Sequence, residues 1–508
     1  MLAKVFSIAL VGLDAHLVEV EVDIGGGLPQ FSIVGLPDAI VRESRDRVRS
    51  ALKNSGFQFP VKKVTVNLAP AGLKKEGSGL DLAIGMGILA AEGIVPAERL
   101  QNHVVVGELS LDGRVKSIPG ALSIGLACRK KHPLILPAEN GAEAALIEGV
   151  EAYPVHTLPE AVDMLCGTRP ISPVASSPDA LAMRPSSEEE DFRDVKGQEQ
   201  AKRALEVAAA GGHNVLMIGP PGSGKTMLAR CLPGILPPMD PEEAIDTTRV
   251  HSVAGLLGNG RSVVTARPFR SPHHSISDAG LIGGGAIPRP GEVSLAHNGV
   301  LFLDEILEFK RPVLEGLRQP LEDGVVSVTR VSASIRYPAR VMLVAAMNPC
   351  PCGFYGDRMR ECLCTPYQIR RYRSKLSGPL LDRLDIHLDI PPVPIRELGS
   401  EGTHEGSAII RGRVAAARSR QGARYRKDGI FCNAQLKPRQ VKRYCAIEAG
   451  PRALLEQAMM QLGLSARAYD RILRVARTIA DLAESTRIEA DHLAEAIQYR
   501  NLDRQQEF

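Results

Sequence analysis

One stretch of the chain has residue types and a spacing that could bind the phosphates of a nucleotide. Its GxxxxGKT pattern is made by eight consecutive residues: Gly219, Pro220, Pro221, Gly222, Ser223, Gly224, Lys225 and Thr226. An apolar run, 215–218, precedes the pattern and a helix-like run, 227–230, follows it. Backbone N–H groups of such a turn can surround phosphates, while the lysine would reach the β- and γ-phosphates and the threonine hydroxyl would contact Mg²⁺. The stretch therefore predicts binding of a nucleoside triphosphate with Mg²⁺.

Two further apolar runs end in polar residues that could complete a hydrolytic site. The run 299–303 has the pattern of a buried parallel strand and ends in Asp304 and Glu305. Asp304 could hold the Mg²⁺ and Glu305 could polarise the attacking water. The run 341–347 ends in Asn348, and open α/β sheets bind ligands at the carboxyl ends of their strands. Asn348 is therefore a candidate for orienting the water against the γ-phosphate.

Four of the nine cysteines are clustered directly after the last of these runs. They form two C-x-C pairs, Cys350 with Cys352 and Cys362 with Cys364, whereas the other five are scattered. Four thiolates can surround Zn²⁺ in a tetrahedron with Zn–S distances of about 2.3 Å. Reduced thiols without a metal are the alternative. We predict one structural zinc ion per chain, bound by these four residues in the loop 350–364.

The composition is that of a globular protein with a mild positive charge. A net charge of +4 over 508 residues neither requires nor excludes nucleic acid, so local basic patches must decide. No apolar run approaches the roughly 18–20 residues that span a bilayer, and the first residues lack a signal-peptide cleavage pattern. Without an export signal, the cysteines are expected to be thiols or metal ligands rather than disulfides. We expect a cytoplasmic protein with no membrane partner.

Changes in composition divide the chain into five segments. Residues 1–165 alternate strand-like and helix-like runs, which predicts an α/β domain, and the proline-, serine- and acid-rich residues 166–191 predict a flexible linker. Residues 192–393 hold the nucleotide pattern and its strands, 394–429 form a basic connector, and the apolar periodicity of 430–508 predicts a helical domain. In the first segment, the predicted strands are 18–23, 31–34, 63–67 and 104–106, and the predicted helices are 38–50 and 80–91.

The motifs GPPGSGKT, LFLDE and AAMN resemble those of AAA+ ATPases in their order and spacing. The segment 194–198 resembles the one that packs on the adenine in that family. An insert over 267–291 and the segment 378–385 narrow the resemblance to the magnesium-chelatase/MCM branch. This resemblance implies ATP and Mg²⁺ as cofactors, Arg383 as an arginine finger, and Arg467 as the sensor-2 arginine of a lid helix. A finger that reaches a neighbouring subunit implies a ring, with a homohexamer as the expected form.

Segments outside the nucleotide site resemble the YifB/ComM family, so that the resemblance covers essentially the whole chain. These segments are 31–38, 67–71 and 107–113. The resemblance implies an α/β fold class with a Lon-protease-like α+β N-terminal domain, an AAA+ α/β domain with a parallel sheet, and a helical C-terminal lid. It also implies an ATP-hydrolysing helicase that promotes branch migration of single-stranded and branched DNA in natural transformation and homologous recombination.

The resemblance of residues 1–165 to the proteolytic domain of Lon raises a protease alternative. Lon-type chemistry needs a serine nucleophile and a lysine base within hydrogen-bond reach. Ser78 is displaced from the Lon-like position, and no lysine occupies the base position in 118–124, since Lys116 lies before that turn. We therefore expect a non-proteolytic module for binding or assembly, with recombination proteins as candidate partners.

Basic residues in three places could contact DNA. The insert carries Arg267 and Arg270, and the segment 325–336, which has the pattern of two strands around a tip, carries Arg330 and Arg336. Contacts of these arginines with phosphates would be independent of base sequence and sensitive to salt. The basic connector could also contact nucleic acid, or it could form a solvated face.

An alternative function from a different class is the remodelling of a protein partner, which the ATPase core of magnesium chelatase performs. No integrin-like metal-binding segment is visible in this chain, and a chelatase subunit would not need the N-terminal domain. Stimulation of ATP hydrolysis by DNA would separate the two functions.

Overall fold

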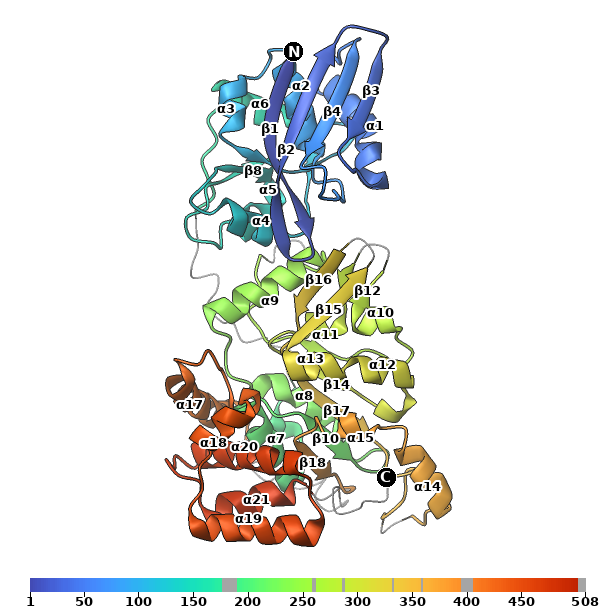
Figure 1. Cartoon of the computed structure of the whole chain (residues 1–508), viewed down its shortest axis with the longest axis vertical. Helices are drawn as coiled ribbons and strands as arrows, with labels where there is room; N and C mark the ends of the chain where they lie inside the picture. Colours follow the sequence, from blue (N-terminus) through green and yellow to red (C-terminus); the bar gives the residue numbers. More distant parts are fainter. Residues whose placement is uncertain are drawn as a thin grey trace. The chain divides into compact units, whose positions relative to one another are not determined.

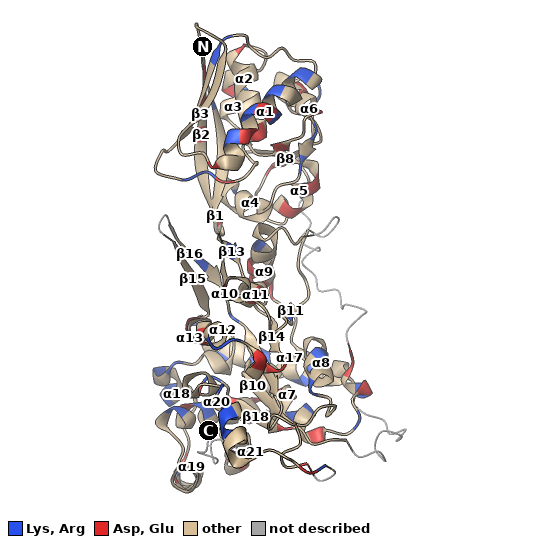
Figure 2. Ribbon diagram, turned by 90° about the vertical axis from the view of Figure 1, so that its right-hand side faces the viewer, with Lys and Arg blue, Asp and Glu red and all other residues tan. Residues whose placement is uncertain are grey.

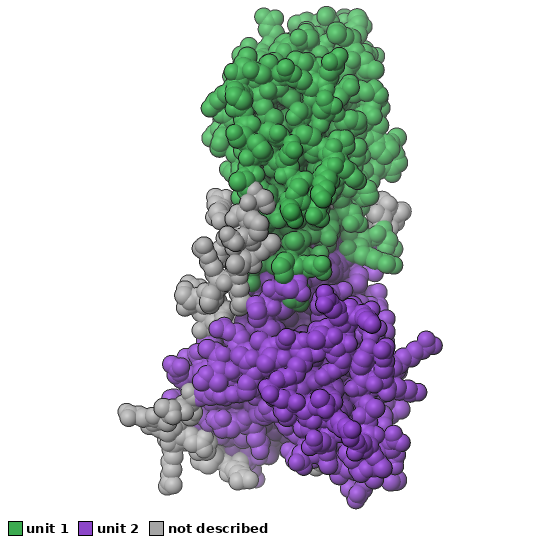
Figure 3. Space-filling model, turned by 90° about the vertical axis from the view of Figure 1, so that its left-hand side faces the viewer, with its two compact units in different colours: residues 1–182, 241–265, 329–336 green, residues 183–240, 266–328, 337–508 purple. Residues whose placement is uncertain are grey.

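The computed structural model describes residues 1–175, 190–257, 262–285, 288–330, 333–357, 360–393 and 405–500. The chain divides into two compact units, which are coloured separately in Figure 3. Unit 1 is built from residues 1–182, 241–265 and 329–336, and unit 2 from residues 183–240, 266–328 and 337–508. Each unit has its own central sheet.

Unit 1 is centred on a seven-stranded mixed sheet with the order β3-β4-β2-β1-β5-β8-β9 (Figure 1). β2 pairs antiparallel with β1 and β4, and the remaining neighbours are parallel. The strands are β1 Leu2–Val11, β2 Asp14–Gly25, β3 Gln30–Val34, β4 Lys63–Ala69, β5 Val104–Val105, β8 Leu134–Pro137 and β9 Ala152–Val155, with a separate pair, β6 Glu108–Leu109 and β7 Val115–Lys116. The helices are α1 Ala39–Asn54, α2 Asp81–Ala91, α3 Ala97–Gln101, α4 Ala121–Cys128, α5 Ala138–Ala144 and α6 Leu158–Cys166. The strands and helices predicted for residues 1–165 are confirmed, with shifted ends.

Helix α2 is buried along its whole length, because apolar and small residues surround its axis. Its one carboxylate, Asp81, is also buried and accepts N–H bonds from Arg47 at 2.7 and 3.0 Å and an O–H bond from Ser44. Burial raises the pKa of Asp81, and the bonds from Arg47 and Ser44 oppose that shift. Buried charges are tolerated when they are paired in this way. The trio therefore ties α1 to the apolar helix at the centre of unit 1.

Helix α9 (Pro241–Val253) belongs to unit 1, although it follows the nucleotide stretch in the sequence. The backbone N–H of Gly120 donates to the carbonyl of Ser252 at 3.2 Å, and the Ser252 hydroxyl bonds the buried carboxylate of Glu143. The predicted ATPase segment 192–393 thus contributes a helix to the N-terminal unit.

Unit 2 contains a five-stranded parallel sheet with the order β11-β14-β17-β10-β18. Its strands are β10 Val215–Ile218, β11 Phe269–Arg270, β14 Val300–Leu303, β17 Met342–Met347 and β18 Ile386–Asp389. Every residue of β10, β14 and β17 is buried, as expected for parallel strands that are covered on both faces. The three strands predicted around the nucleotide stretch are therefore confirmed.

Further helices belong to unit 2 with this sheet, and two short strand pairs lie in the same stretch of sequence, the second of which includes residues 329–336 of unit 1. The helices are α7 Glu199–Gly211, α8 Lys225–Ile235, α10 Asp278–Leu281, α11 Glu292–Leu295, α12 Arg311–Gly316, α13 Arg318–Asp323, α14 Pro366–Arg373 and α15 Gly378–Leu381. β12 Gly283–Gly284 pairs with β13 Arg289–Pro290, and β15 Val325–Arg330 pairs with β16 Ala333–Pro338. The second pair confirms the predicted two strands around a tip, and the tip itself, 331–332, lies outside the described residues.

The C-terminal part of unit 2 is helical, as its apolar periodicity predicts (Figure 1). Its helices are α17 Ser407–Tyr425, α18 Pro438–Tyr444, α19 Ala449–Leu462, α20 Ala466–Leu482 and α21 Ala490–Gln498. Ile472, Val475 and Ile479 of α20 are buried in one apolar core with α7 and the sheet. None of the helices in the described parts of the chain is long and apolar enough to cross a bilayer.

Basic residues of the predicted connector make contacts inside unit 2, where Figure 2 shows Lys and Arg on α17, α18 and α20. Arg413 of α17 donates to the buried carboxylate of Glu206 at 2.5 Å. Arg424 donates to the buried carboxylate of Asp481 at 2.5 and 3.0 Å. The first pair joins α17 to α7 and the second joins it to α20, which favours a structural role for these two arginines.

Candidate nucleotide-binding site

The parallel sheet of unit 2 brings the three predicted polar strand ends to one edge. β17 lies between β14 and β10, and all three strands point the same way. The phosphate loop, 219–224, follows β10, Asp304 and Glu305 follow β14, and Asn348 follows β17. Residues far apart in the sequence therefore meet at the edge where open parallel sheets bind ligands.

The backbone of the phosphate loop leaves room for a ligand. Gly222 and Gly224 have φ angles of 78° and 90°, which glycine adopts without strain, and a β-carbon at either position would face open space. Ser223 Oγ is buried and has no hydrogen-bond partner among the described residues. A buried hydroxyl without a partner is costly, and a phosphate oxygen in the loop would satisfy it. The loop therefore fits a bound phosphate group.

Lys225 and Thr226, at the start of α8, connect the three strand ends. Lys225 Nζ donates to two carbonyls of the loop at 2.7 and 2.9 Å and to Asn348 Oδ1 at 3.4 Å. Burial lowers the pKa of Lys225, and the charges of Asp304 and Glu305 oppose that shift. Thr226 Oγ1 donates to Asp304 Oδ2 at 2.8 Å. A hydroxyl and a carboxylate are thus placed side by side, and oxygen atoms are the ligands that Mg²⁺ takes.

An open cavity of about 580 Å³ lies beside these strand ends. Its lining comes from the strand ends, from the loop with the clustered cysteines, and from α14 and the residues after it: Glu305, Glu308, Asn348, Pro351, Gln368, Arg371, Tyr372 and Lys375. Glu305 has a φ angle of 49°, which is uncommon for a residue other than glycine. Such backbone conformations cluster at functional sites.

The contribution of α14 to this cavity was not predicted from the sequence. Arg371 and Lys375 place cations in the lining next to two glutamates, and Lys375 Nζ lies 3.6 Å from a carboxylate oxygen of Glu308. The basic run that follows the second cysteine pair was the only signal in the sequence, and such runs are usually solvated surfaces.

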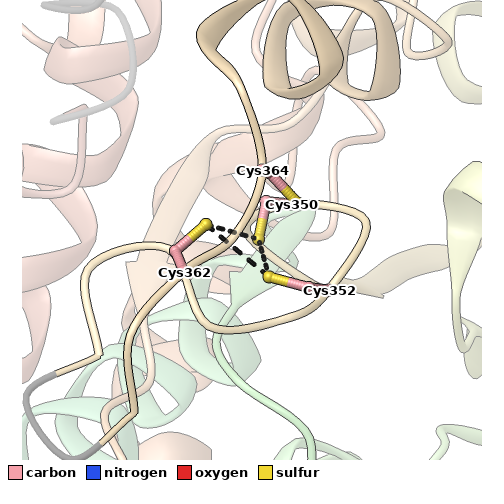
Figure 4. Close-up of side chains that lie close together, drawn as sticks. All are labelled: Cys350, Cys352, Cys362 and Cys364. Atoms are coloured by element: carbon pink, nitrogen blue, oxygen red, sulfur yellow. Dashed lines mark hydrogen bonds between the residues drawn. The ribbon is translucent and has the colours of Figure 1, made fainter.

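The four clustered cysteines form one group of thiols whose side chains point toward one another (Figure 4). Cys350 Sγ lies 3.3 Å from Cys352 Sγ and 3.7 Å from Cys362 Sγ, the latter two atoms are 3.6 Å apart, and all four sulfur atoms, including that of Cys364, lie within 4.8 Å of one another. A disulfide would need about 2.05 Å. A tetrahedral Zn²⁺ with Zn–S bonds of about 2.3 Å separates its sulfur ligands by roughly 3.8 Å. The group therefore fits zinc.

Backbone amides donate to these sulfur atoms. The Tyr355 backbone nitrogen lies 3.3 Å from Cys350 Sγ. The Phe354 amide, together with other donors, lowers the pKa of the Cys352 thiol, whereas burial and the neighbouring thiols raise the pKa of Cys362 and Cys364. Amide donors favour the thiolate, which is the form that binds metal. Within the described ranges, no other group of three or more His, Cys, Asp or Glu side chains could hold a metal ion.

Arg383 and Arg467, the two arginines predicted to read the γ-phosphate, lie close together, because Arg467 pairs with Asp382, the residue before Arg383. Arg467 Nη1 lies 3.1 Å from Asp382 Oδ2. Arg383 donates to the carbonyls of Arg318 and Pro379 at 3.1 and 2.7 Å and forms an ion pair with a glutamate of α13. Among the described residues, neither arginine has a hydrogen bond or ion pair with the phosphate loop of its own chain.

The four arginines predicted to contact DNA lie in different settings. Arg267 donates to three backbone carbonyls at 2.6–3.2 Å, and Arg270 makes two bonds with Glu292 at 2.6 and 2.7 Å. Both guanidinium groups therefore bind carbonyls or a carboxylate of their own chain. Arg336 of β16 is exposed, whereas the side chain of Arg330 lies outside the described residues.

Ser78 and Lys75 of unit 1 have separate partners. Ser78 Oγ bonds the carboxylate of Glu108. Lys75 is fully buried, and its Nζ donates to three carbonyls, including that of Leu68 at 2.7 Å. Burial lowers the pKa of Lys75. In the described part of unit 1, Ser78 and Lys75 therefore bond to different groups and not to each other.

Known proteins resemble this chain along nearly its whole length. Residues 20–140, 191–398 and 404–500 match families described as "Subunit ChlI of Mg-chelatase", "Magnesium chelatase, subunit ChlI" and "Magnesium chelatase, subunit ChlI C-terminal". The chain is 47% identical to the protein YifB of Salmonella typhimurium and 46% identical to the competence protein ComM of Haemophilus influenzae, in each case over 99% of this chain and 98% of the relative. It is 31% identical to Lon protease 2 of Bacillus subtilis over 30% of this chain and 28% of that protein.

The parallel sheet, the phosphate loop and the acidic strand end, together with the family matches, define a magnesium-chelatase-like AAA+ ATPase. Because its identity to YifB and ComM extends over almost all of both chains, the chain belongs to the YifB/ComM family. The predicted fold class is confirmed: a Lon-like mixed α/β N-terminal part, a parallel AAA+ sheet and a helical C-terminal part.

Proposed function

We propose that this chain is an ATP-driven motor that acts as a homohexameric ring on single-stranded and branched DNA and promotes branch migration during recombination of transforming DNA. The observation that carries the DNA assignment is the 46% identity, over 99% of the chain, to a protein named for competence. The nucleotide site would supply the energy, and the Lon-like unit would serve as a module that binds recombination proteins.

In this proposal, the phosphate loop and Lys225 bind the β- and γ-phosphates of ATP. Lys225 exchanges its bonds with the loop carbonyls, at 2.7 and 2.9 Å, for bonds with phosphate oxygens. Thr226 and Asp304, which already lie 2.8 Å apart, hold the metal. Mg²⁺, when bound, neutralises charge that develops on the phosphates.

Hydrolysis needs a group that takes a proton from the attacking water and a group that orients this water. Glu305 takes the proton, because its carboxylate lines the same cavity as Asn348 and no ion pair of Glu305 is present among the described residues. Asn348 orients the water through its side-chain amide, because its Oδ1 already accepts from the lysine that binds the phosphate. General bases of this kind contribute about 10²–10⁴-fold to a rate.

Arg383 and Arg467 complete the site of a neighbouring subunit. This assignment is supported by their contacts, since the described hydrogen bonds and ion pairs of both are with residues outside their own phosphate loop. A site that lacks these cations in one chain and receives them from the next works only in a ring.

We also assign one structural Zn²⁺ per chain to Cys350, Cys352, Cys362 and Cys364. Their sulfur separations and amide donors support a tetrahedral site. Sites with four thiolate ligands have no open position, so the metal would hold the loop and take no part in the chemistry of hydrolysis.

Lys225→Ala is expected to abolish displacement of the invading strand from a synthetic D-loop in the presence of ATP, because the variant lacks the cation that binds the phosphates. Release of the labelled strand is followed on a gel at equal protein concentrations. Lys62→Ala, which removes an exposed lysine of unit 1, serves as the control and should act like the wild type. Strand displacement by Lys225→Ala at the wild-type rate would contradict an ATP-driven motor.

Arg336→Ala is expected to weaken the binding of single-stranded DNA, because Arg336 is an exposed cation on β16. Loss of one phosphate contact should reduce the dependence of log affinity on log salt by about 0.7. DNA binding is measured at several salt concentrations by fluorescence anisotropy. Arg45→Ala, at an exposed arginine of α1, is the control, and an unchanged salt slope for Arg336→Ala would remove this residue from the DNA surface.

Remodelling of a protein partner is the second candidate function, favoured by the matches of residues 191–398 and 404–500 to families of a magnesium chelatase subunit. The two candidates differ in what stimulates the ATPase. ATP turnover that is the same with and without single-stranded and branched DNA would favour protein remodelling over the DNA motor.

A further inference from the structure

The loop with the four cysteines touches the nucleotide site at three places. We name its two described segments, 349–357 and 360–364, the cysteine knuckle. The first contact is covalent, since Cys350 lies two residues after Asn348, whose Oδ1 accepts from Lys225. Cys350 is fully buried shortly after β17, which ends at Met347, so one of the four cysteines is held close to the central sheet.

The second contact joins the knuckle to the phosphate loop. Gly353 has a φ angle of 86°, and a β-carbon at this position would lie 2.7 Å from Pro221 Cδ and 3.0 Å from Pro221 Cγ. Carbon atoms that are not bonded do not approach so closely, so only glycine allows this approach. The knuckle therefore braces the phosphate loop directly. Gly356 has a similar φ angle of 80°, but a β-carbon there would face open space.

The third contact joins the knuckle to α14. The side chain of Arg373 is buried, donates to the Pro349 carbonyl at 3.0 Å, and places its guanidinium 5.3 Å from the ring centre of Tyr355. The backbone of Tyr355 in turn donates to Cys350 Sγ. Because Thr365 caps α14 directly after Cys364, the helix that lines the hydrolytic cavity is tied to the knuckle at both of its ends.

We propose that zinc in the cysteine knuckle and nucleotide in the phosphate loop strengthen each other's binding through the contact between Gly353 and Pro221. The inference rests on the nucleotide and zinc sites of the proposed function and adds the coupling between them. Without metal, ordering the knuckle costs backbone entropy. With metal, the knuckle is closed and holds the phosphate loop in the conformation that binds phosphates. Such coupling is reciprocal, so each ligand must raise the affinity of the other by the same factor.

The test measures two equilibria on the full chain, neither of which needs DNA or turnover. Zinc affinity is measured by competition with a chromophoric chelator, with and without saturating MgADP. Affinity for a fluorescent ADP is measured on zinc-loaded and zinc-free protein. Each ligand is expected to raise the affinity of the other about fivefold or more, which is the usual range for coupled sites. A factor of one in the wild type would overturn the proposal.

Two glycine variants test the contact while all four thiols stay in place. Gly353→Ala is expected to keep one zinc per chain but to bring the coupling factor close to one, because the new methyl group pushes the knuckle and Pro221 apart. Gly356→Ala adds the same methyl group at a similar φ angle in open space and should keep the wild-type factor. Equal loss of coupling in both variants, or full coupling in Gly353→Ala, would overturn the role of this contact.

Metal analysis by mass spectrometry, on protein purified without chelators, establishes the zinc itself. One zinc per wild-type chain is expected, with none in the double variant Cys362→Ser/Cys364→Ser and one in the control Cys166→Ser. Zinc that is absent from the wild type, or retained in the double variant, would overturn the inference. Failure of the proposed function would look different, since a wild-type chain that binds no nucleotide has no ATP-driven motor, whatever its zinc content.

Discussion

Arg383→Ala should slow ATP turnover by about 10³-fold or more, because arginine fingers contribute roughly 10³–10⁵ to phosphoryl transfer. Arg383 also pairs with Glu322 and donates to the carbonyls of Arg318 and Pro379, so the melting temperature of the variant is measured alongside its turnover. Steady-state ATPase rates at saturating ATP and DNA measure the loss. Arg318→Ala is the control, because the Arg318 carbonyl accepts from Arg383 whereas the Arg318 side chain pairs with Glu315.

A mixing experiment tells whether this arginine acts on a neighbour. Lys225→Ala and Arg383→Ala subunits are each expected to be inactive in pure rings. In mixed rings, the intact Lys225 of one subunit can face the intact Arg383 of the next, so part of the turnover should return. A mixture that stays as inactive as its two components would contradict a site shared between subunits.

Glu305→Gln should lower turnover by about 10²–10⁴-fold while nucleotide affinity stays close to that of the wild type. The amide has the shape of the carboxylate but cannot take a proton from water, and the contacts of Lys225 and Thr226 do not involve Glu305. The variant is therefore expected to hold ATP without hydrolysing it. Rates come from phosphate release and affinity from titration with a fluorescent ATP analogue.

Glu308→Gln is the matched control, because Glu308 lines the same cavity but pairs with Lys375 at 3.6 Å. Its turnover should stay within a few-fold of the wild type. If both variants lost turnover equally, the effect would come from the negative charge of the cavity, and Glu305 would not be the general base.

Much of the nucleotide site could be predicted because its parts are contiguous in the sequence. A glycine-rich turn between an apolar strand and a helix, and apolar runs that end in Asp304, Glu305 and Asn348, indicate strand ends in a parallel sheet. The four cysteines could be predicted as one group for a similar reason, since two C-x-C pairs in a short loop can converge. In each case the structure brings together what the spacing indicates.

The partners of long charged side chains could not be predicted in this way. Arg413 pairs with Glu206, and Arg424 pairs with Asp481. These residues of a basic run thus join α17 to α7 and to α20, which are far from it in the sequence. Arg270 likewise pairs with Glu292 inside the insert. A run of arginines in a sequence has the same pattern whether it faces DNA, solvent or buried carboxylates.

The amino-acid sequence by itself determined the family and fold class of this protein and indicated the residues of its candidate nucleotide site, because backbone turns and strand ends depend on neighbouring residues. Only the tertiary structure decided that α9 belongs to unit 1, that α14 lines the cavity beside the strand ends, and that Gly353 lies against Pro221. These three features depend on the order of strands and the path of loops, which bring together residues that share no local pattern. The link between the cysteine knuckle and the phosphate loop is therefore a property of the packed fold.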